Sequence, residues 1–302
     1  MSALYGDGSA GALTVTGTAP NILQALAPMG NLQFTDVTIE RGARLIVTSG
    51  TVLRCTGRFT LRGSLSVSPF ASGSPDLDSP PHPGLARSSA TNGQTGSATI
   101  PSRSGRGGFG IGENLARYLV HPGLAGGGGG GVSPQSNILT AIDGGGTMTI
   151  LCRGAIENDL GGLGALPEGG ITVPGAGGGG GGVLILGSGT SITNRGTISV
   201  AGGAGVAGNS AVGPGGGGGG GLVRLIAPTI TLTGGTIDVA GGAPGAMATV
   251  TLSTRSGGGG GGGCVGDGGG GGGVSTSGVV SAATAGAAGF LFSTTIDPAR
   301  VL

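Results

Sequence analysis

The chain has 302 residues, of which 78 are glycine, 16 are proline, none is tryptophan and 9% are charged. A formal net charge of +1 gives no electrostatic reason to expect nucleic acid or an anionic membrane as a partner. The sequence contains no stretch of 18 apolar residues, so it does not predict a transmembrane helix. Glycine and proline together account for 94 residues, a composition that on its own indicates a low-complexity or disordered chain. The regular patterns described next favour a fibrous or solenoid protein instead.

Residues 1–67 predict an N-terminal β domain. The opening MSALYGDGSAGALTVTG lacks the basic and apolar regions of a secretory signal, so we expect synthesis in the cytoplasm. A short strand is expected at 12–16 and a single helical turn before Pro28. From Gln33 to Val67, apolar residues alternate in runs of three to five, separated by turns at ERGAR, TSGT, CTGR and LRGS. This spacing suits the strands of a β-solenoid or a compact meander.

Residues 68–125 interrupt this pattern with a segment rich in proline, glycine and serine. Proline excludes regular strand or helix over most of it, although 113–120 could form a short helix before His121 and Pro122. We interpret the segment as a long excursion from the β structure or as a hinge.

Residues 126–302 form a glycine-rich repeat domain. Uninterrupted glycine runs occupy 126–131, 177–182, 215–221, 257–263 and 268–273. Shifting the sequence by 39 positions aligns Val183 with Leu222 and Ile198 with Ile237, so each unit contains a glycine run, two short strands with a turn, and a glycine-rich exit. A third copy aligns Ile150 with Ile192 at an offset of 42. Periods of 20–50 residues are typical of stacked repeats.

The glycine runs can form an ordered structure and need not be flexible linkers. Their lengths are regular and they contain no serine. A three-residue-per-turn helix of the polyproline II type leaves all its N–H and C=O groups pointing sideways, where parallel rods can bond to one another. The fold class expected is therefore all-β and fibrous, with β-solenoid-like strands and a packed array of polyglycine II helices.

Sequence motifs for catalysis or metal binding are weak. The chain has no lysine, which a P-loop requires, and its three cysteines, Cys55, Cys152 and Cys264, stand too far apart for a zinc motif. We expect these cysteines to be small buried hydrophobic residues, and we expect no cofactor, no metal site and no catalytic residues. A polysaccharide depolymerase that uses paired carboxylates, at Asp76 and Asp78 or at Glu157 and Asp159, is the alternative.

Binding residues, if the rods form a scaffold, should lie in the connectors at the rod ends, because glycine itself offers no side chain. The connectors contain four candidates for receptor binding: Asn209, Met247, Arg255 and Asp267.

The glycine runs of regular length, separated by short segments, resemble the glycine-rich adhesins at the tips of T-even-like phage tail fibres. The opening YGDGSAGALTVTG, the strand–Arg-Gly–strand units and GGGGGGGLVRLIA are also similar to glycine-rich proteins of phage tails and tailspikes. The resemblance implies a polyglycine II sandwich, an N-terminal domain that attaches to other tail proteins, and loops that bind a host-surface protein or polysaccharide. It leaves both a single copy and a homotrimer open.

From this resemblance we expect a non-enzymatic virion tail protein, made in the host cytoplasm, that recognises the host surface. The alternatives are a structural brace of the fibre or baseplate without receptor contact, the depolymerase named above, and an ice-binding protein with a threonine-rich face at 229–233.

Overall fold

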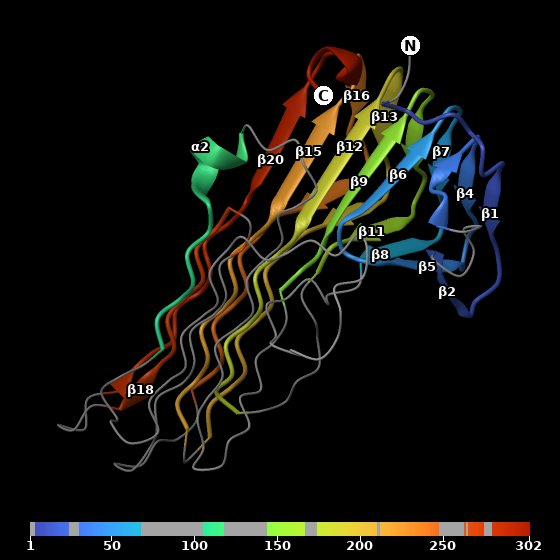
Figure 1. Ribbon diagram of the computed structural model, residues 1–302. Coiled ribbons are helices and arrows are strands. Elements are labelled where there is room, and N and C mark those ends of the chain that lie inside the picture. The colour runs from blue at the N-terminus through green and yellow to red at the C-terminus, as the bar shows by residue number, and fades with distance from the viewer. Residues whose placement is uncertain are drawn as a thin grey trace.

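The computed structural model describes residues 4–23, 30–67, 105–117, 144–166, 174–209, 212–247, 263, 265–274 and 280–302 (Figure 1). Predicted features that lie outside these residues include the glycine run 126–131, most of the 257–263 run and most of the 68–125 excursion. Among the described residues strands dominate, and the helices with assigned bounds are α2 (Gly112–Ala116) and the 3-10 helix η2 (Pro298–Arg300).

Three sheets, each of six parallel strands, form the larger part of the described chain. Sheet A contains β1 (Leu13–Val15), β4 (Val37–Ile39), β7 (Phe59–Leu61), β10 (Ile156–Asn158), β13 (Ser191–Asn194) and β16 (Thr229–Thr231). Sheet B contains β2 (Pro20–Ile22), β5 (Arg44–Val47), β8 (Ser64–Val67), β11 (Gly162–Gly164), β14 (Thr197–Ser199) and β17 (Thr236–Asp238). Sheet C contains β3 (Gln33–Phe34), β6 (Thr51–Cys55), β9 (Thr147–Cys152), β12 (Val183–Ser188), β15 (Leu222–Ile226) and β20 (Phe290–Thr294). The short strands β18 (Gly273–Val274) and β19 (Val280–Ser281) pair antiparallel.

The chain visits sheets A, B and C in turn, six times over. We call each set of three strands a layer, so that layer 1 is β1, β2 and β3, and layer 6 is β16, β17 and β20. The all-β prediction is confirmed at this level. The expected unit of two strands is wrong, because each unit has three, as β12, β13 and β14 show. The turn at 189–190 divides the first expected strand into β12, which belongs to sheet C, and β13, which belongs to sheet A.

Alternation within the strands places one set of side chains between the three sheets. In β4, Val37 and Ile39 are fully buried while Thr38 points outward, and β6, β7 and β8 follow the same rule. The interior is therefore filled by one continuous apolar cluster that runs through the layers. Full burial of one such side chain is worth about 1.5–3 kcal/mol.

Registers of the parallel strands test the repeat alignments. Val183 pairs with Leu222 and Ile198 with Ile237, which confirms the offset of 39. The offset of 42 is wrong, because Ile156 pairs with Ile192 at an offset of 36. The error arises because Arg-Gly occurs at two different corners: Gly154 follows sheet C, whereas Gly196 follows sheet A.

Cys55 and Cys152 form a disulfide, which corrects the expectation that they are separate small hydrophobic residues. They face each other in register on β6 and β9, with their Cα atoms 4.6 Å apart. The bond therefore joins layer 2 to layer 3 on either side of the long insertion that begins after β8.

Two buried asparagines interrupt the apolar interior at matching positions of β10 and β13. The amide nitrogen of Asn158 donates to the side-chain oxygen of Asn194 at 2.7 Å, and the amide of Asn194 donates to the carbonyl of Thr236 at 3.2 Å. The earlier layers carry Leu61 and Ile39 at this position. The amides thus form a short ladder between layers 4, 5 and 6.

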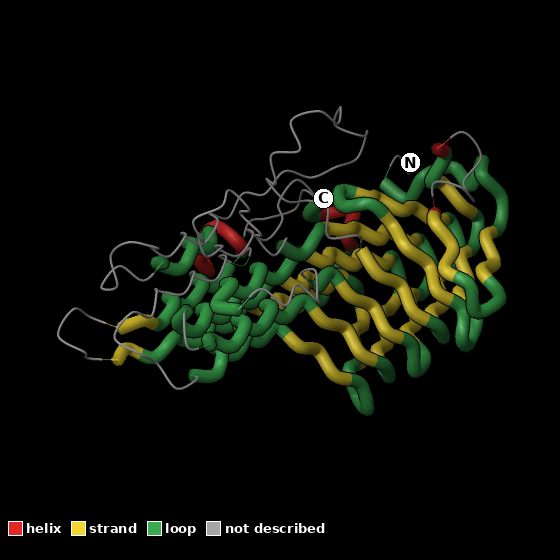
Figure 2. Tube along the Cα trace, turned by 90° about the horizontal axis from the view of Figure 1, so that it is seen from below, coloured by secondary structure: helices red, strands yellow, loops and turns green. Residues whose placement is uncertain are grey.

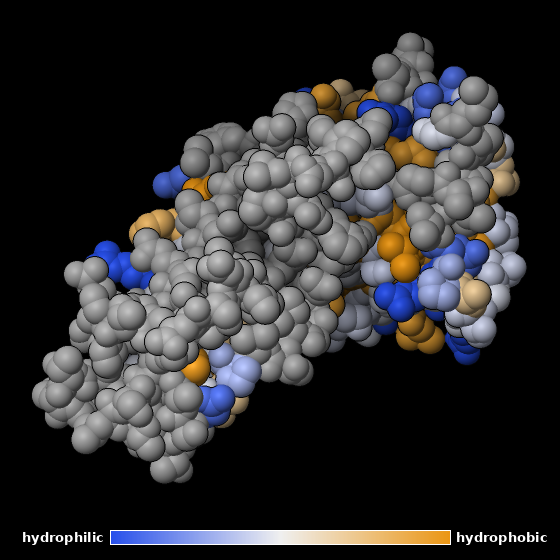
Figure 3. All heavy atoms as spheres, turned by 60° about the horizontal axis from the view of Figure 1, so that its bottom comes forward, coloured by the Kyte–Doolittle hydropathy of each residue, from blue (hydrophilic) through white to orange (hydrophobic). Residues whose placement is uncertain are grey.

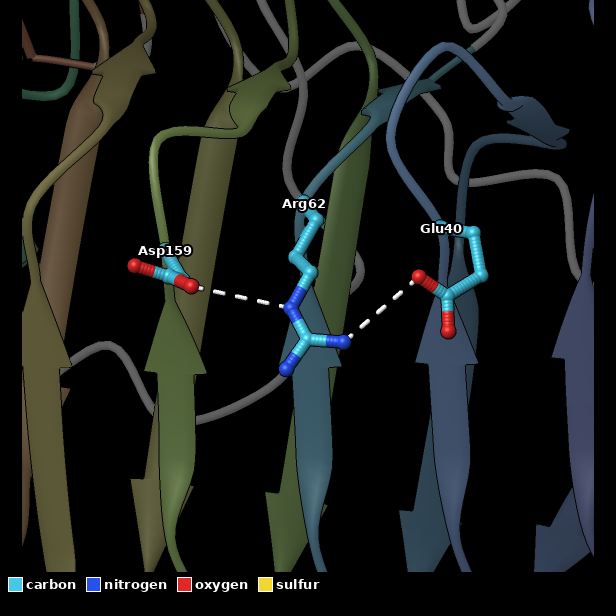
Figure 4. A network of polar contacts seen from close by, with 3 residues as sticks. All are labelled: Glu40, Arg62 and Asp159. Atoms are coloured by element: carbon cyan, nitrogen blue, oxygen red, sulfur yellow. Dashed lines mark hydrogen bonds and ion pairs between the residues drawn. The ribbon is translucent and has the colours of Figure 1, made fainter.

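Connections from sheet A to sheet B are short, and their side chains stack from layer to layer. Arg62 lies between Glu40 and Asp159, at 3.5 Å from one carboxylate and 3.6 Å from the other (Figure 4). All three side chains are about two-fifths exposed, so each pair contributes at most about 1 kcal/mol. These charges therefore contribute little to the stability of the fold.

The two ends of the chain meet beside the layers, as Figure 1 shows. The hydroxyl of Tyr5 donates to a carboxylate oxygen of Asp297 at 3.0 Å, across 292 positions of sequence. The Arg54 side chain donates to the carbonyl of Leu4, so the N-terminal segment is also tied to layer 2.

The boundary predicted at residue 67 falls between strands that share the same sheets. β8 pairs with β11, and β6 pairs with β9. Strands of the N-terminal β domain and of the glycine-rich repeat domain therefore stack on one another.

Candidate functional site: the far end of the glycine array

Long excursions leave the layered sheets at a single corner, between sheet B and sheet C. They follow β8, β11, β14 and β17, and each returns to a strand of sheet C. Their described parts lie side by side and project away from the sheets (Figures 1 and 2). We call these parts the glycine array, and they are residues 105–110, 174–182, 201–209, 212–221, 240–247, 263 with 265–274, and 280–289.

Hydrogen bonds within the array repeat at every third residue. The amides of Gly215, Gly218 and Gly221 donate to one neighbouring segment, at the carbonyls of Val206, Gly203 and Val200. The amides of Gly217 and Gly220 donate to a different one, at the carbonyls of Thr284 and Ala287. Successive residues of the run therefore bond to different neighbouring segments, so its hydrogen bonds point in several directions.

The 215–221 run lies at the centre of this arrangement. Its carbonyls accept from three further segments, through the amides of Gly178, Gly181, Gly242, Gly245, Gly266 and Gly269. Together with the two segments that accept its own bonds, the run contacts five described neighbours. Some of these neighbours run parallel to it and others antiparallel.

Contact between the segments leaves no room for side chains. A Cβ atom on Gly218 would overlap the carbonyl oxygen of Gly179, and one on Gly221 would overlap that of Gly182. None of the described glycines of the runs 177–182, 215–221 and 268–273 has a positive φ, so a left-handed backbone is not what selects glycine here. The requirement is close approach of one backbone to another.

The end of the array that lies away from the sheets carries the turns between segments. Asn209 and Val212 bond to each other in one such turn: each backbone amide donates to the other's carbonyl, and the Val212 amide also bonds to the Asn209 side-chain oxygen, at 2.9 Å. The pair β18 and β19 lies at the same level, since Gly272 bonds to Pro214 next to this turn. Figure 1 shows β18 at this far end.

Two of the four predicted binding residues meet at this end. Gly208 bonds to Ala246, so the next residues along, Asn209 and Met247, stand at the same level on neighbouring segments. Both are exposed, Met247 to 43%. The β18–β19 pair was not among the predicted binding elements, because sequence alone does not show which connectors reach the same level.

Asp267 lies elsewhere, and Arg255 lies outside the described residues. Gly266 bonds to Gly220, so Asp267 is separated from the Asn209 turn by the length of the 215–221 run, about 20 Å for extended backbone. Its carboxylate accepts from the amide of Gly110 at 2.8 Å, which joins the segments 105–110 and 265–274 of the array. This contact gives Asp267 a structural role.

The carboxylate pairs considered for catalysis are not placed together as a site. Asp76 and Asp78 lie outside the described residues. Glu157 points outward from the middle of β10, Asp159 directly follows that strand, and Arg62 binds Asp159. Within the described residues no group of three or more histidine, cysteine or acidic side chains could hold a metal ion.

A column of threonines crosses the outer face of sheet A. The outward residues that pair in register across the six strands are Thr14, Thr38, Thr60, Glu157, Thr193 and Thr231. On the face seen in Figure 3, hydrophobic and hydrophilic residues alternate in small patches over the coloured part of the molecule.

No family model, no curated protein and no solved structure matches the chain. Among the described residues, no helix is both long and apolar enough to cross a membrane.

Proposed function

We propose that this protein is a non-enzymatic component of a phage tail fibre or tail tip that recognises the host surface with the far end of its glycine array. In this proposal the three parallel sheets form a β-solenoid, and the array is a bundle of polyglycine II helices. The protein works in the virion after synthesis in the host cytoplasm.

The observation that carries the proposal is the lateral hydrogen bonding of the array at every third residue. Three residues per turn is the repeat of a polyproline II helix, which has no internal hydrogen bonds and so offers all its polar groups to neighbours. A bundle bonded in this way holds its shape without a hydrophobic core. Loops on a rigid scaffold are the common location of binding residues.

The geometry also supports the choice of the far end. Segments that leave one corner and stop at one level present their turns together, here the Asn209–Val212 turn, Met247 and the β18–β19 pair. The sheets stay at the other end, where they can join the rest of a tail.

The proposal is tested by binding of the labelled full chain to whole bacteria, with a panel of strains and flow cytometry. The same protein is then added to a phage that carries it, and the adsorption rate is measured. We expect binding to the phage's own hosts and slower adsorption. Binding to no host strain, together with unchanged adsorption, would leave the structural brace as the function.

Variants locate the contact. Replacing Asn209 and Met247 together by alanine should weaken binding to host cells by about tenfold or more, since a few residues usually dominate an interface. The matched control replaces Thr38 and Thr60, on the outer face of sheet A, by alanine and should bind like the wild type. The opposite ranking would move the binding face to sheet A and contradict the proposal.

Ice binding is a second candidate because of the threonine column on sheet A. A flat sheet presents such hydroxyls at a regular strand spacing of about 4.8 Å. Glu157 breaks the column, and the charged row of Glu40, Arg62 and Asp159 lies beside it. Thermal hysteresis of the purified protein would support this candidate, and its loss in Thr38→Lys would assign it to this face.

A further inference from the structure

Layer 6 leaves three strand edges open among the described residues. β16, β17 and β20 each stand at the end of their sheet and pair on one side only, with β13, β14 and β15. An edge strand offers unpaired N–H and C=O groups and so invites another chain to pair with it.

The apolar interior is also open at this end. Ile230, Leu232, Ile237 and Val239 are only partly buried, and Leu291 is 37% exposed, although these residues occupy inward positions in β16, β17 and β20 or directly after them. One layer earlier, the equivalent residues are almost completely buried, as in Ile192 and Val223.

The opposite end of the sheets is closed. Val15 and Phe34 in layer 1, and Leu23 directly after β2, are at most 2% exposed. The two ends therefore do not match, so stacking of layer 6 on layer 1 of another copy would bring an open end against a covered one.

The open edges carry little that would keep another chain away. Natural edge strands are protected by lysine, proline, bulges or inward charges. In β16, β17 and β20 the single charged residue is Asp238, and its carboxylate accepts from the backbone amide of Ala240 at 3.0 Å.

We propose that the layer 6 end is an interface with a second copy of this chain, related by a two-fold axis. A partner for this end must offer three strand edges in the same arrangement around an apolar centre. Layer 6 of a second copy carries the same three edges, and a two-fold interface uses the same surface of both subunits. The two-fold axis reverses the direction of the chain around the partner's layer. Facing strands then run antiparallel, with β20 opposite its counterpart and β16 opposite β17, a favourable direction for pairing.

This inference is independent of the proposed function, because it uses the end of the sheets and not the far end of the array. It predicts a homodimer, whereas the sequence resemblance left a single copy and a homotrimer open.

The test is the molar mass of the full chain by size-exclusion chromatography with light scattering, up to about 100 µM. We expect twice the chain mass of 28.0 kDa. Amide exchange should slow in 229–231, 236–238 and 290–294 as the protein concentration rises. A monomer over the whole range, or a trimer, would overturn the inference.

The main variant is Leu291→Arg, which keeps an exposed side chain in the monomer but buries an unpaired charge in the dimer. Dimerisation should weaken by about tenfold or more. Circular dichroism checks the fold, and Ser293→Arg, at the next inward and exposed position of β20, gives a second route if Leu291→Arg unfolds. Met247→Arg, at the far end of the array, is the matched control and should remain dimeric. A dimer that survives both β20 variants would place the interface elsewhere and contradict the inference.

Discussion

Leu160 stands alone among the described residues as a non-glycine with a positive φ, 62°. It occupies the turn between β10 and β11, and its side chain is 67% exposed. The left-handed conformation costs an L-residue about 1–2 kcal/mol, and an exposed leucine gains little packing in return. The corresponding longer turn between β16 and β17 has Gly234 in this conformation, with φ at 86°.

Replacing Leu160 by glycine should therefore raise stability by about 1 kcal/mol, because the strain disappears with the Cβ atom. Urea unfolding followed by circular dichroism measures the change. Leu166→Gly is the control, since Leu166 is also exposed but has no positive φ, and it should lower stability. Equal effects of the two variants would show that the turn is not strained.

The asparagine ladder makes a second prediction at the scale of single residues. Asn194→Leu leaves the buried amide of Asn158 without its 2.7 Å partner, and we expect a loss of about 1–3 kcal/mol. The double variant, with leucine at both positions, should recover most of that loss, because the earlier layers are apolar there. A double-mutant cycle by urea unfolding measures the coupling, and additive losses would contradict a direct interaction.

At the scale of elements, the array depends on bare backbone. Gly218→Ala brings a Cβ atom into the carbonyl oxygen of Gly179, so at least two segments must move apart. We expect a loss of more than about 2 kcal/mol and faster amide exchange in neighbouring segments. Thermal unfolding and exchange measured by mass spectrometry provide the readout.

The control for this prediction is Gly162→Ala on β11. No atom lies within 4 Å of the Cβ position of Gly162, and its φ is not positive. Alanine should be neutral or slightly stabilising there. If Gly218→Ala were equally harmless, the runs would not owe their composition to close approach.

Much of the element-level structure follows from sequence. Alternation identified the short strands from Gln33 to Val67, and the repeat of Val183 at Leu222 gave a register that β12 and β15 adopt. The third strand of each unit was missed because strand-forming residues continue on both sides of Gly189 and Thr190, and only Arg195-Gly196 before β14 was recognised as a turn. The disulfide was missed because Cys55 and Cys152 are brought together by stacking of layers across an insertion, which local spacing does not encode.

The candidate site was predictable only in part. A glycine run predicts an extended segment. The position of its connecting turn along the array depends on the direction and register of the neighbouring segments, which the sequence does not show. Asn209 and Met247 share a level because 201–209 and 240–247 run parallel and both residues end their segments. The segment 265–274 runs in the same direction, but Asp267 lies near its start and so at the opposite end.

For the whole molecule, the contact between the chain ends has a pH dependence. Burial, together with the hydrogen bond to Asp297 and its negative charge, raises the pKa of Tyr5 to about 12. The ordinary pKa of a tyrosine is about 10, so the stability that this contact contributes is complete below pH 10. It is lost as the pH rises from about 10 to about 12.

Tyr5→Phe should abolish this part of the alkaline fall in stability. Chemical unfolding at a series of pH values from 8 to about 12 compares the variant with the wild type. Below pH 10 the variant should be less stable, and the difference should shrink at higher pH. A constant difference over the whole range would mean that the hydroxyl does not titrate in this contact.

The spacing of three between successive bonds to one neighbour restricts how this molecule can change in length. Adding a single glycine to the 215–221 run would rotate every later residue by a third of a turn and direct its amides at the wrong neighbours. Growth is compatible with the bundle only in steps of three residues, taken together by adjoining segments. With the rise of the proposed polyglycine II helices, each step would move the tip outward by about 9 Å. The length of the array can therefore change only in fixed steps, and mutations that lengthen one glycine run alone should be selected against.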